Sequence, residues 1–168
     1  MIACNYYSGE PVTGLEEGRP MFLRRPDSHL GLANFMRSHL YASLATLKIG
    51  LDILLKEEDV KIDSITGHGG LFKTKGVGQS ILAAAMNAPI SVMETAGEGG
   101  AWGMALLAAY MLFKKDGQSL GDYLDSRVFA ERKSETMEPD PADVVGFETY
   151  TKQYQACLAA EKAAVQAF

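Results

Sequence analysis

Apolar positions recur at helical spacing in two long stretches of the chain. From Ser28, the expected N-cap, to about Glu57, leucine and methionine side chains repeat every three or four positions, which predicts a long helix with one apolar stripe. From Ala142 to the C-terminus, similar spacing predicts a terminal helix packed across the domain. The two expected apolar faces consist of Leu32, Met36, Leu40, Leu44, Leu47, Leu51 and Leu54, and of Val144, Phe147, Tyr154, Leu158, Val165 and Phe168.

The middle of the chain alternates short apolar runs with glycine-rich loops. A strand, a glycine loop and a helix follow one another, and the same order is then repeated. Such alternation predicts an α/β fold with a mostly parallel sheet flanked by helices, and it places ligands in the loops at the carboxyl ends of the strands. The expected segments are the strands 61–66 and 90–93, the loops 67–70 and 97–100, and the helices 77–87 and 101–113.

The remaining segments are less regular. Residues 5–20 are rich in glycine and proline and predict an irregular loop, and residues 21–24 predict a short strand. Residues 130–141 are charged and contain proline, which indicates a surface connection. The apolar run 101–113 is too short to span a bilayer, so it predicts a buried helix and no membrane partner.

Composition narrows the classes of protein that fit. The 168 residues are 47% hydrophobic, which is typical of one globular domain with a sizeable core and excludes a disordered chain. The formal net charge of -5 argues against a nucleic-acid partner. The N-terminus lacks the features of a targeting signal, which predicts a cytoplasmic protein. Cys4 and Cys157 are far apart in sequence and are expected to be buried or idle thiols.

The two glycine loops are the main candidates for chemistry. A glycine loop before a helix exposes backbone N–H groups at the positive end of the helix dipole, where a phosphate is favoured. A single loop often contains glycine for turn geometry alone, whereas two loops from neighbouring strands favour a nucleotide. The Walker A pattern starts at neither Gly67 nor Gly70, and a Rossmann pattern started at Gly97 ends at Trp102, which is too large for that position.

Polar side chains near the loops carry weaker signals. His68, Lys73 and Lys75 could contact a phosphate, although exposed loop side chains without a role are as common. Glu94 and Glu98 could orient a magnesium-bound water, or they could simply stabilise the N-terminus of the following helix. The pattern contains no catalytic triad and no set of residues at metal-ligand spacing, so no catalytic residue and no metal ligand are predicted.

Two stretches of the sequence resemble a known family. The segment ITGHGGLFKTKGVGQSILAAAMNAPISVMETAGEGGAWGMALLAAYM and the upstream NYYSGEPVTG are similar to the ATP-binding C-terminal domain of the FGGY carbohydrate kinases. The resemblance implies a partial actin-like, ribonuclease H-like ATPase domain. The first loop reads Gly-His-Gly-Gly-Leu-Phe-Lys-Thr where the family usually has Gly-Gly-Gly-Ala-Lys-Ser, so which glycine faces which phosphate stays open.

The resemblance also implies an activity. Residues 1–168 would be the C-terminal, nucleotide-binding portion of a two-domain, xylulokinase-like enzyme that uses ATP and Mg²⁺ to phosphorylate xylulose or a related ketopentose. The family's sugar site and catalytic aspartate belong to an N-terminal domain that we expect to be absent here, so this chain alone should be inactive. The nucleotide-binding residues implied are Gly67, Gly69 and Gly70 on the phosphate side, and Gly99, Gly100 and Ala101 on the nucleoside side.

Two alternatives remain open at this point. The chain could instead be a stand-alone, non-catalytic nucleotide-binding or interaction domain of the same fold. The apolar residues of the last helix could cover either this domain or a partner.

A sheet that lacks its first strands would also leave an unpaired edge, which predicts self-association into a homo-oligomer through that edge.

Overall fold

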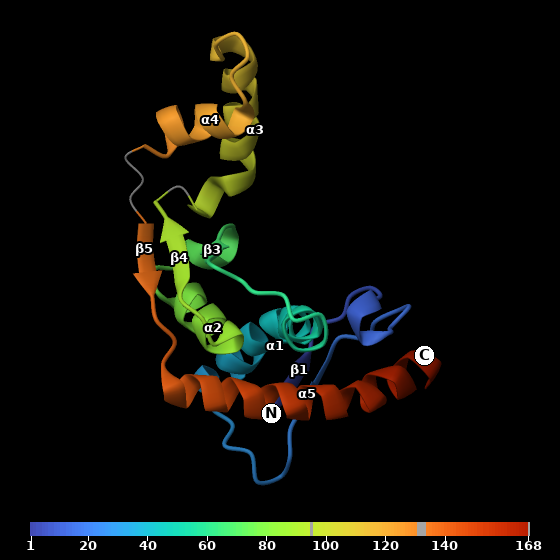
Figure 1. Cartoon of the computed structure of the whole chain (residues 1–168). Coiled ribbons are helices and arrows are strands. Elements are labelled where there is room, and N and C mark those ends of the chain that lie inside the picture. Colours follow the sequence, from blue (N-terminus) through green and yellow to red (C-terminus); the bar gives the residue numbers. More distant parts are fainter. Residues whose placement is uncertain (95, 131–133, 168) are drawn as a thin grey trace. The chain divides into compact units, whose positions relative to one another are not determined.

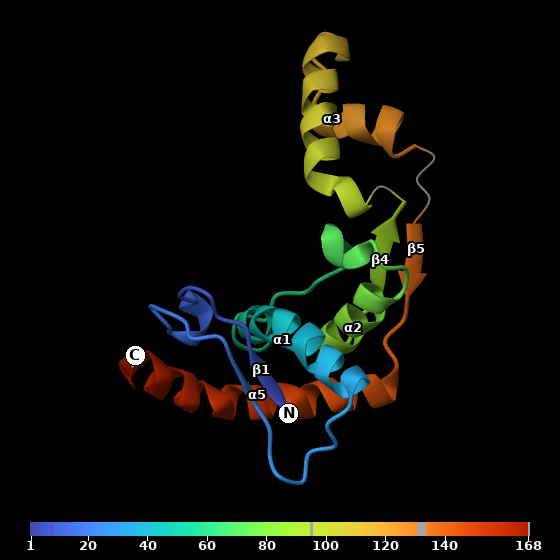
Figure 2. The same ribbon diagram turned by 180° about the vertical axis from the view of Figure 1, so that it is seen from behind.

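The computed structural model describes residues 1–94, 96–130 and 134–167, and Figures 1 and 2 show it from opposite sides. The chain divides into two compact units, which are described separately. Unit 1 comprises Met1–Asp63, Ile81–Asn87 and Pro139–Phe168, and unit 2 comprises Ser64–Ser80 and Ala88–Glu138.

Unit 1 is built around two long helices. In it, α1 (Leu32–Asp52) continues through a π-helical turn at Ile53–Glu57, and α5 (Pro141–Ala167) packs against α1. The end of the first helix and the extent of α5 agree with the predictions, although α1 starts later than predicted and Phe168 lies outside the described residues. A short antiparallel pair, β1 (Ile2–Cys4) and β2 (Met21–Leu23), completes the unit, and the segment between these strands is irregular apart from a 3-10 turn at Pro11–Thr13.

The core of unit 1 is aromatic. Tyr41 of α1 stands edge-on to Tyr150 of α5, with ring centroids 5.2 Å apart, and lies 4.8 Å from Phe147. The buried Tyr154 hydroxyl donates a hydrogen bond to the Tyr6 hydroxyl at 2.6 Å. The Tyr150 hydroxyl donates to the backbone carbonyl of Ser38 in α1 at 3.0 Å. These bonds satisfy the phenols that the packing removes from water.

The buried face of α1 differs from the predicted leucine stripe. Leu44 is buried as expected, but Leu32 is 78% exposed and Leu47 is 50% exposed. The face toward the core instead contains Ser38, Tyr41, Ala42, Leu44, Ala45 and Lys48. Small residues on this face allow α1 to approach the bulky aromatic side chains of α5, a requirement that the spacing of leucines does not reveal.

The predicted N-cap of α1 is also wrong. The helix begins after Gly31, and no side-chain cap is formed there. The Ser28 hydroxyl accepts a hydrogen bond from the Arg25 backbone N–H at 3.0 Å, and the Ser28 N–H donates to the Arg25 carbonyl. Ser28 therefore closes a turn before the helix, which is a common alternative use of serine.

Unit 2 contains a small mixed sheet in the order β3-β4-β5. The predicted parallel pairing is confirmed, because β3 (Ile65–Gly67) runs parallel to β4 (Ile90–Met93). Residues 134–137, predicted as part of a surface connection, instead form β5 (Ser134–Met137), which pairs antiparallel with β4. The helices are α2 (Val77–Met86), whose second half belongs to unit 1, α3 (Gly99–Phe113) and α4 (Leu120–Tyr123), which a π-helical turn at Leu124–Val128 extends.

The apolar helix α3 is not buried, contrary to the prediction. No residue of α3 is buried, and Met111 is 77% exposed. Its contacts within unit 2 include Trp102 against Phe129 and Tyr110 against Tyr123, with ring centroids 5.9 and 5.5 Å apart. These contacts occupy only part of the helix surface. Among the described helices, none combines the length and apolar character needed to cross a membrane.

Candidate functional site

The two glycine loops meet at one edge of the sheet in unit 2. The parallel register pairs Gly67, the last residue of β3, with Val92 near the end of β4, so both following loops leave the sheet at its carboxyl edge. The Lys73 ammonium group binds the Glu98 carboxylate with 2.6 Å between Nζ and Oε1, and this ion pair joins the two loops. The sheet therefore brings together the segments that the sequence analysis singled out.

The first loop turns sharply after β3. Gly67 is buried, and a Cβ atom placed there would lie 2.4 Å from the ring of Phe72, so this glycine makes room for the aromatic side chain. Gly69 has a φ of 107°, which favours glycine, and a 3-10 turn at Gly70–Phe72 follows it. Gly67 and Gly69 thus have clear structural reasons to be glycine.

Gly70 and Gly100 have no such structural reason. Neither has a positive φ, and a Cβ atom added at either position would meet no heavy atom within 4 Å. Both residues are exposed, as is Ala101. An approaching ligand can therefore reach the backbone at these positions.

The second loop leads directly into the N-terminus of α3. Glu98 is the N-cap residue, but its side chain makes no capping hydrogen bond and pairs with Lys73 instead. The first N–H groups of α3 thus lack a side-chain cap, and they lie at the positive end of a 15-residue helix. Gly99 packs beneath His68, whose Nδ1 atom would lie 3.2 Å from a Cβ atom at position 99. His68 therefore contacts the second loop.

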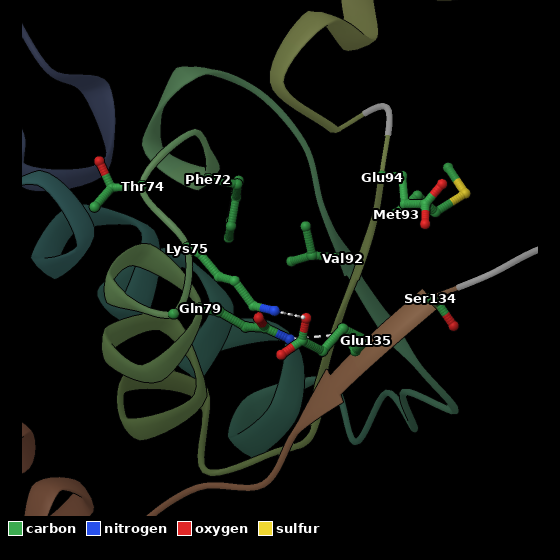
Figure 3. A pocket seen from close by; sticks show the side chains of 10 residues that line it. Phe72, Thr74, Lys75, Gln79, Val92, Met93, Glu94, Ser134 and Glu135 are labelled. Atoms are coloured by element: carbon green, nitrogen blue, oxygen red, sulfur yellow. Dashed lines mark hydrogen bonds and ion pairs between the residues drawn. The ribbon is translucent and has the colours of Figure 1, made fainter.

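A hollow of about 410 Å³ lies beside the first loop, between the start of α2, the end of β4 and the start of β5 (Figure 3). Lys75 and Glu135 form an ion pair of 3.0 Å at this hollow. Gln79 is buried, and its amide Nε2 donates to the Ile90 carbonyl at 2.7 Å and to the Glu135 carbonyl at 2.8 Å. The lining residues are Phe72, Thr74, Lys75, Gly76, Gln79, Val92, Met93, Glu94, Ser134 and Glu135.

None of the six glycine and alanine residues predicted as nucleotide-binding lines this hollow. Lys75 and Glu94 were considered as candidates, whereas Gln79 and Ser134 were missed. A signal for Gln79 was present, since it is the one amide side chain in a mostly apolar helix. Ser134 and Glu135 were not predictable, because they reach the site through the unexpected strand β5.

Electrostatics at the junction of the loops depend on the Lys73–Glu98 pair. The hydrogen bond and the positive charge of Lys73 lower the pKa of the Glu98 carboxyl below its ordinary value. Within residues 1–94, 96–130 and 134–167, no three His, Cys, Asp or Glu side chains gather as a metal-ligand set. A metal ion at this edge would therefore depend on a ligand's own oxygen atoms, with single carboxylates such as the exposed Glu94 nearby.

Comparison with known proteins gives two matches. Residues 1–112 match the sequence model of the C-terminal domain of the FGGY family of carbohydrate kinases. Among curated proteins, none matches the chain. A ligand-bound xylulose kinase from Lactobacillus acidophilus has a similar structure, with a TM-score of 0.63 and 21% identity over 96% of this chain. The chain spans 32% of that protein's length, and the likeness confirms the predicted partial actin-like ATPase fold.

Proposed function

The chain belongs to the FGGY family of carbohydrate kinases, and from this we propose that residues 1–168 are the C-terminal, nucleotide-binding portion of an ATP-dependent sugar kinase. The whole enzyme would transfer the γ-phosphoryl group of ATP to a sugar hydroxyl. The meeting of the two glycine loops at the carboxyl edge of β3 and β4 is the observation that carries this proposal. In open α/β sheets, ligands bind outside this edge.

We assign the phosphates to the first loop and the nucleoside to the second. The phosphates would lie against Gly69 and Gly70, with Gly67 before them. The open space around the backbone of Gly70 would let a phosphate approach closely. Gly99, Gly100 and Ala101 would border the nucleoside side. The uncapped N-terminus of α3 adds a favourable field for an anion at the junction.

Two lysines and a metal ion would balance the phosphate charge. Lys73 and Lys75 lie at the first loop, and both are exposed enough to exchange a carboxylate partner for a phosphate. Mg²⁺ would arrive with the nucleotide and neutralise charge that develops on the transferred phosphoryl group. Glu94 is the side chain that we propose to hold a water of that ion.

The sugar and the catalytic base would come from another part of the enzyme. We propose xylulose or a related ketopentose as the sugar, on the basis of the sequence resemblance and the name of the structural relative. The base would be a carboxylate outside this chain, so the 168-residue chain alone should show no sugar-dependent release of ADP. Sugar-dependent release of ADP above that of a glycine-loop variant would contradict the assignment of the base to another part of the enzyme.

Titration calorimetry of the chain with MgADP tests the nucleotide site directly. The substitutions Gly70→Val and Gly100→Val should each weaken binding at least tenfold, because the new side chain blocks access to the backbone, while circular dichroism stays unchanged. Gly146→Val is the matched control, since Gly146 is also exposed and a Cβ atom there would also meet nothing. Equal affinity in all four proteins would refute the site.

A second experiment separates the kinase from the stand-alone binding domain. An antibody against α5 would measure the mass of the native polypeptide that carries this sequence. A product several times heavier than 18.2 kDa would support a two-domain kinase. A native product of about 18.2 kDa that binds MgADP would instead favour the non-catalytic alternative.

A further inference from the structure

The two cysteines of the chain come together in unit 1, although they lie near opposite ends of the sequence. Cys4 is the last residue of β1, and Cys157 lies on α5. The strand β1 packs against α5, and both views of the chain show it crossing that helix (Figures 1 and 2). Nothing in their spacing connects them, so the sequence alone predicts two separate thiols.

Their surroundings show that the two thiols face each other. Tyr150, Tyr154, Cys157 and Glu161 recur at three or four positions along α5, so Cys157 continues the stripe of α5 that is buried in unit 1. Cys4 is fully buried on the strand that packs against α5, and its thiol lies beside the thiol of Cys157. Cys157 is only half-buried, so one thiol of the pair can be reached from the solvent.

We propose that Cys4 and Cys157 form a redox modification site, at which a low-molecular-weight disulfide oxidises the pair to an intramolecular disulfide linking β1 to α5. The geometry differs from that of two idle thiols in one decisive respect. A buried thiol in contact with a half-exposed thiol supplies both the group that meets the oxidant and the group that resolves the mixed disulfide.

The accessibility of the two thiols sets the order of the steps. The Cys157 thiol loses a proton, and its sulfur attacks one sulfur of the oxidant, which breaks the oxidant's S–S bond and releases one thiolate. The Cys4 thiol then loses its proton and attacks Cys157 Sγ, which forms the Cys4–Cys157 bond and releases the second thiolate. Two electrons pass to the oxidant, and the two protons leave with the released thiols.

Neighbouring groups make this oxidation slow near neutral pH. Burial, together with the charges of Cys157 and Glu161, raises the pKa of the Cys4 thiol to about 12. Burial and Glu161 also raise the pKa of Cys157, while the N-terminal ammonium group opposes that shift. Tyr150 and Tyr154 also face the pair, and because burial raises the pKa of each, both are uncharged at this pH. The rate of disulfide formation should therefore increase as the pH is raised above neutrality.

Oxidised glutathione and the complete 168-residue chain provide the test. After incubation and alkylation under native and then denaturing conditions, we expect a monomer that has lost two hydrogen atoms, carries no alkyl group and yields a Cys4–Cys157 cross-linked peptide. The thermal midpoint should rise by several degrees and return to its original value after reduction, because the bridge closes a loop of most of the chain.

Two variants keep the result interpretable. Cys157→Ser changes the half-exposed member and should fold, form no covalent dimer and show neither the mass loss nor the shift in midpoint. Cys4→Ala should accumulate the glutathione adduct at Cys157, because the resolving thiol is missing. A stable glutathione adduct at Cys157 in the unaltered chain, a covalent dimer, or two thiols that stay alkylatable at every pH would overturn the proposal.

Discussion

The two units of this chain differ in how much of their apolar surface they bury. Unit 1 encloses an aromatic core in which Phe147 is fully buried and Tyr154 is 1% exposed. Unit 2 carries the candidate site on a three-stranded sheet whose centre is the buried Ile90, and its longest helix, α3, buries no residue. The larger buried core and the candidate site therefore lie in different parts of the sequence.

This difference is expected from the chemistry of the two regions. A packed core excludes water and holds its side chains in single positions. A loop that accepts a ligand must instead leave its backbone N–H groups accessible, as at Gly70 and Gly100. The single tryptophan of the chain, Trp102, lies in unit 2, and five of the seven tyrosines lie in unit 1. Tryptophan fluorescence therefore reports on unit 2, and the tyrosine signal reports mainly on unit 1.

The largest expected effect is the loss of the aromatic core. Phe147→Ala should destabilise unit 1 by about 3–5 kcal/mol, because it leaves a cavity beside Tyr41 and Tyr150. Urea unfolding followed by the near-ultraviolet signal of the tyrosines measures this change. Met111→Ala on α3 is the control, and it should change stability by less than about 0.5 kcal/mol since Met111 is 77% exposed. Equal losses in the two variants would abolish the contrast between the units.

Raising the pH above 10 should destabilise unit 1 without a mutation. Burial raises the pKa of Tyr150 and Tyr154 well above 10, the ordinary value for tyrosine. Because the folded state holds these protons more tightly than the unfolded state, the stabilisation is complete below pH 10 and is lost as the pH rises further. The urea midpoint of unit 1 should fall across this range. A core in which both phenols ionise at the ordinary pH, with no loss of stability, would contradict this expectation.

A pair of glycine substitutions sharpens the comparison within unit 2. Gly67→Ala should cost about 1–3 kcal/mol, because its Cβ atom would lie 2.4 Å from the ring of Phe72 and the ring must move. Gly70→Ala should change stability by less than about 0.5 kcal/mol, since the space around that position is open. Trp102 fluorescence during urea unfolding measures both. Adding Phe72→Leu to Gly67→Ala should recover part of the loss.

The smallest effect concerns the ion pair between the loops. Lys73→Met should return the pKa of Glu98 upward to its ordinary value, because Lys73 is the main cause of the lowered pKa. A lowered pKa stabilises the folded state above the carboxyl's ordinary pKa, and that stabilisation is lost as the pH falls through the lowered value. Both side chains are more than half exposed, so no change in the urea midpoint is expected. Titration of the Glu98 carboxyl by nuclear magnetic resonance measures the shift, and an unchanged titration would show that the pair does not form.

Local patterns in the sequence were sufficient for much of unit 2. The strand 90–93 and the helix starting at residue 77 were predicted correctly, and the parallel pairing followed from the repeated order of strand, loop and helix. These features depend on neighbours within a few residues, such as glycine after a strand or apolar residues at regular spacing. The six predicted site residues are also near one another as a result, and their contact with a nucleotide stays a prediction.

Features that depend on distant segments were missed. The exposure of α3, the strand β5 and the contact between Cys4 and Cys157 each require knowledge of what lies opposite in space. The same holds for α1, where alanine and serine face the aromatic side chains of α5 and most of the leucine stripe does not. Hydrophobicity reports how much a residue gains from burial, but it does not report whether a partner surface is present.

The sequence by itself therefore determined the family, the order of the central strands and helices, and the loops that carry the candidate site. Only the tertiary structure decided which face of each helix is buried, that Gly67 makes room for Phe72 while Gly70 stays open, and that the two thiols meet. The physical reason is the range of the interactions involved. Backbone conformation and helical periodicity depend on adjacent residues, whereas packing and side-chain pairing depend on segments that the fold brings together.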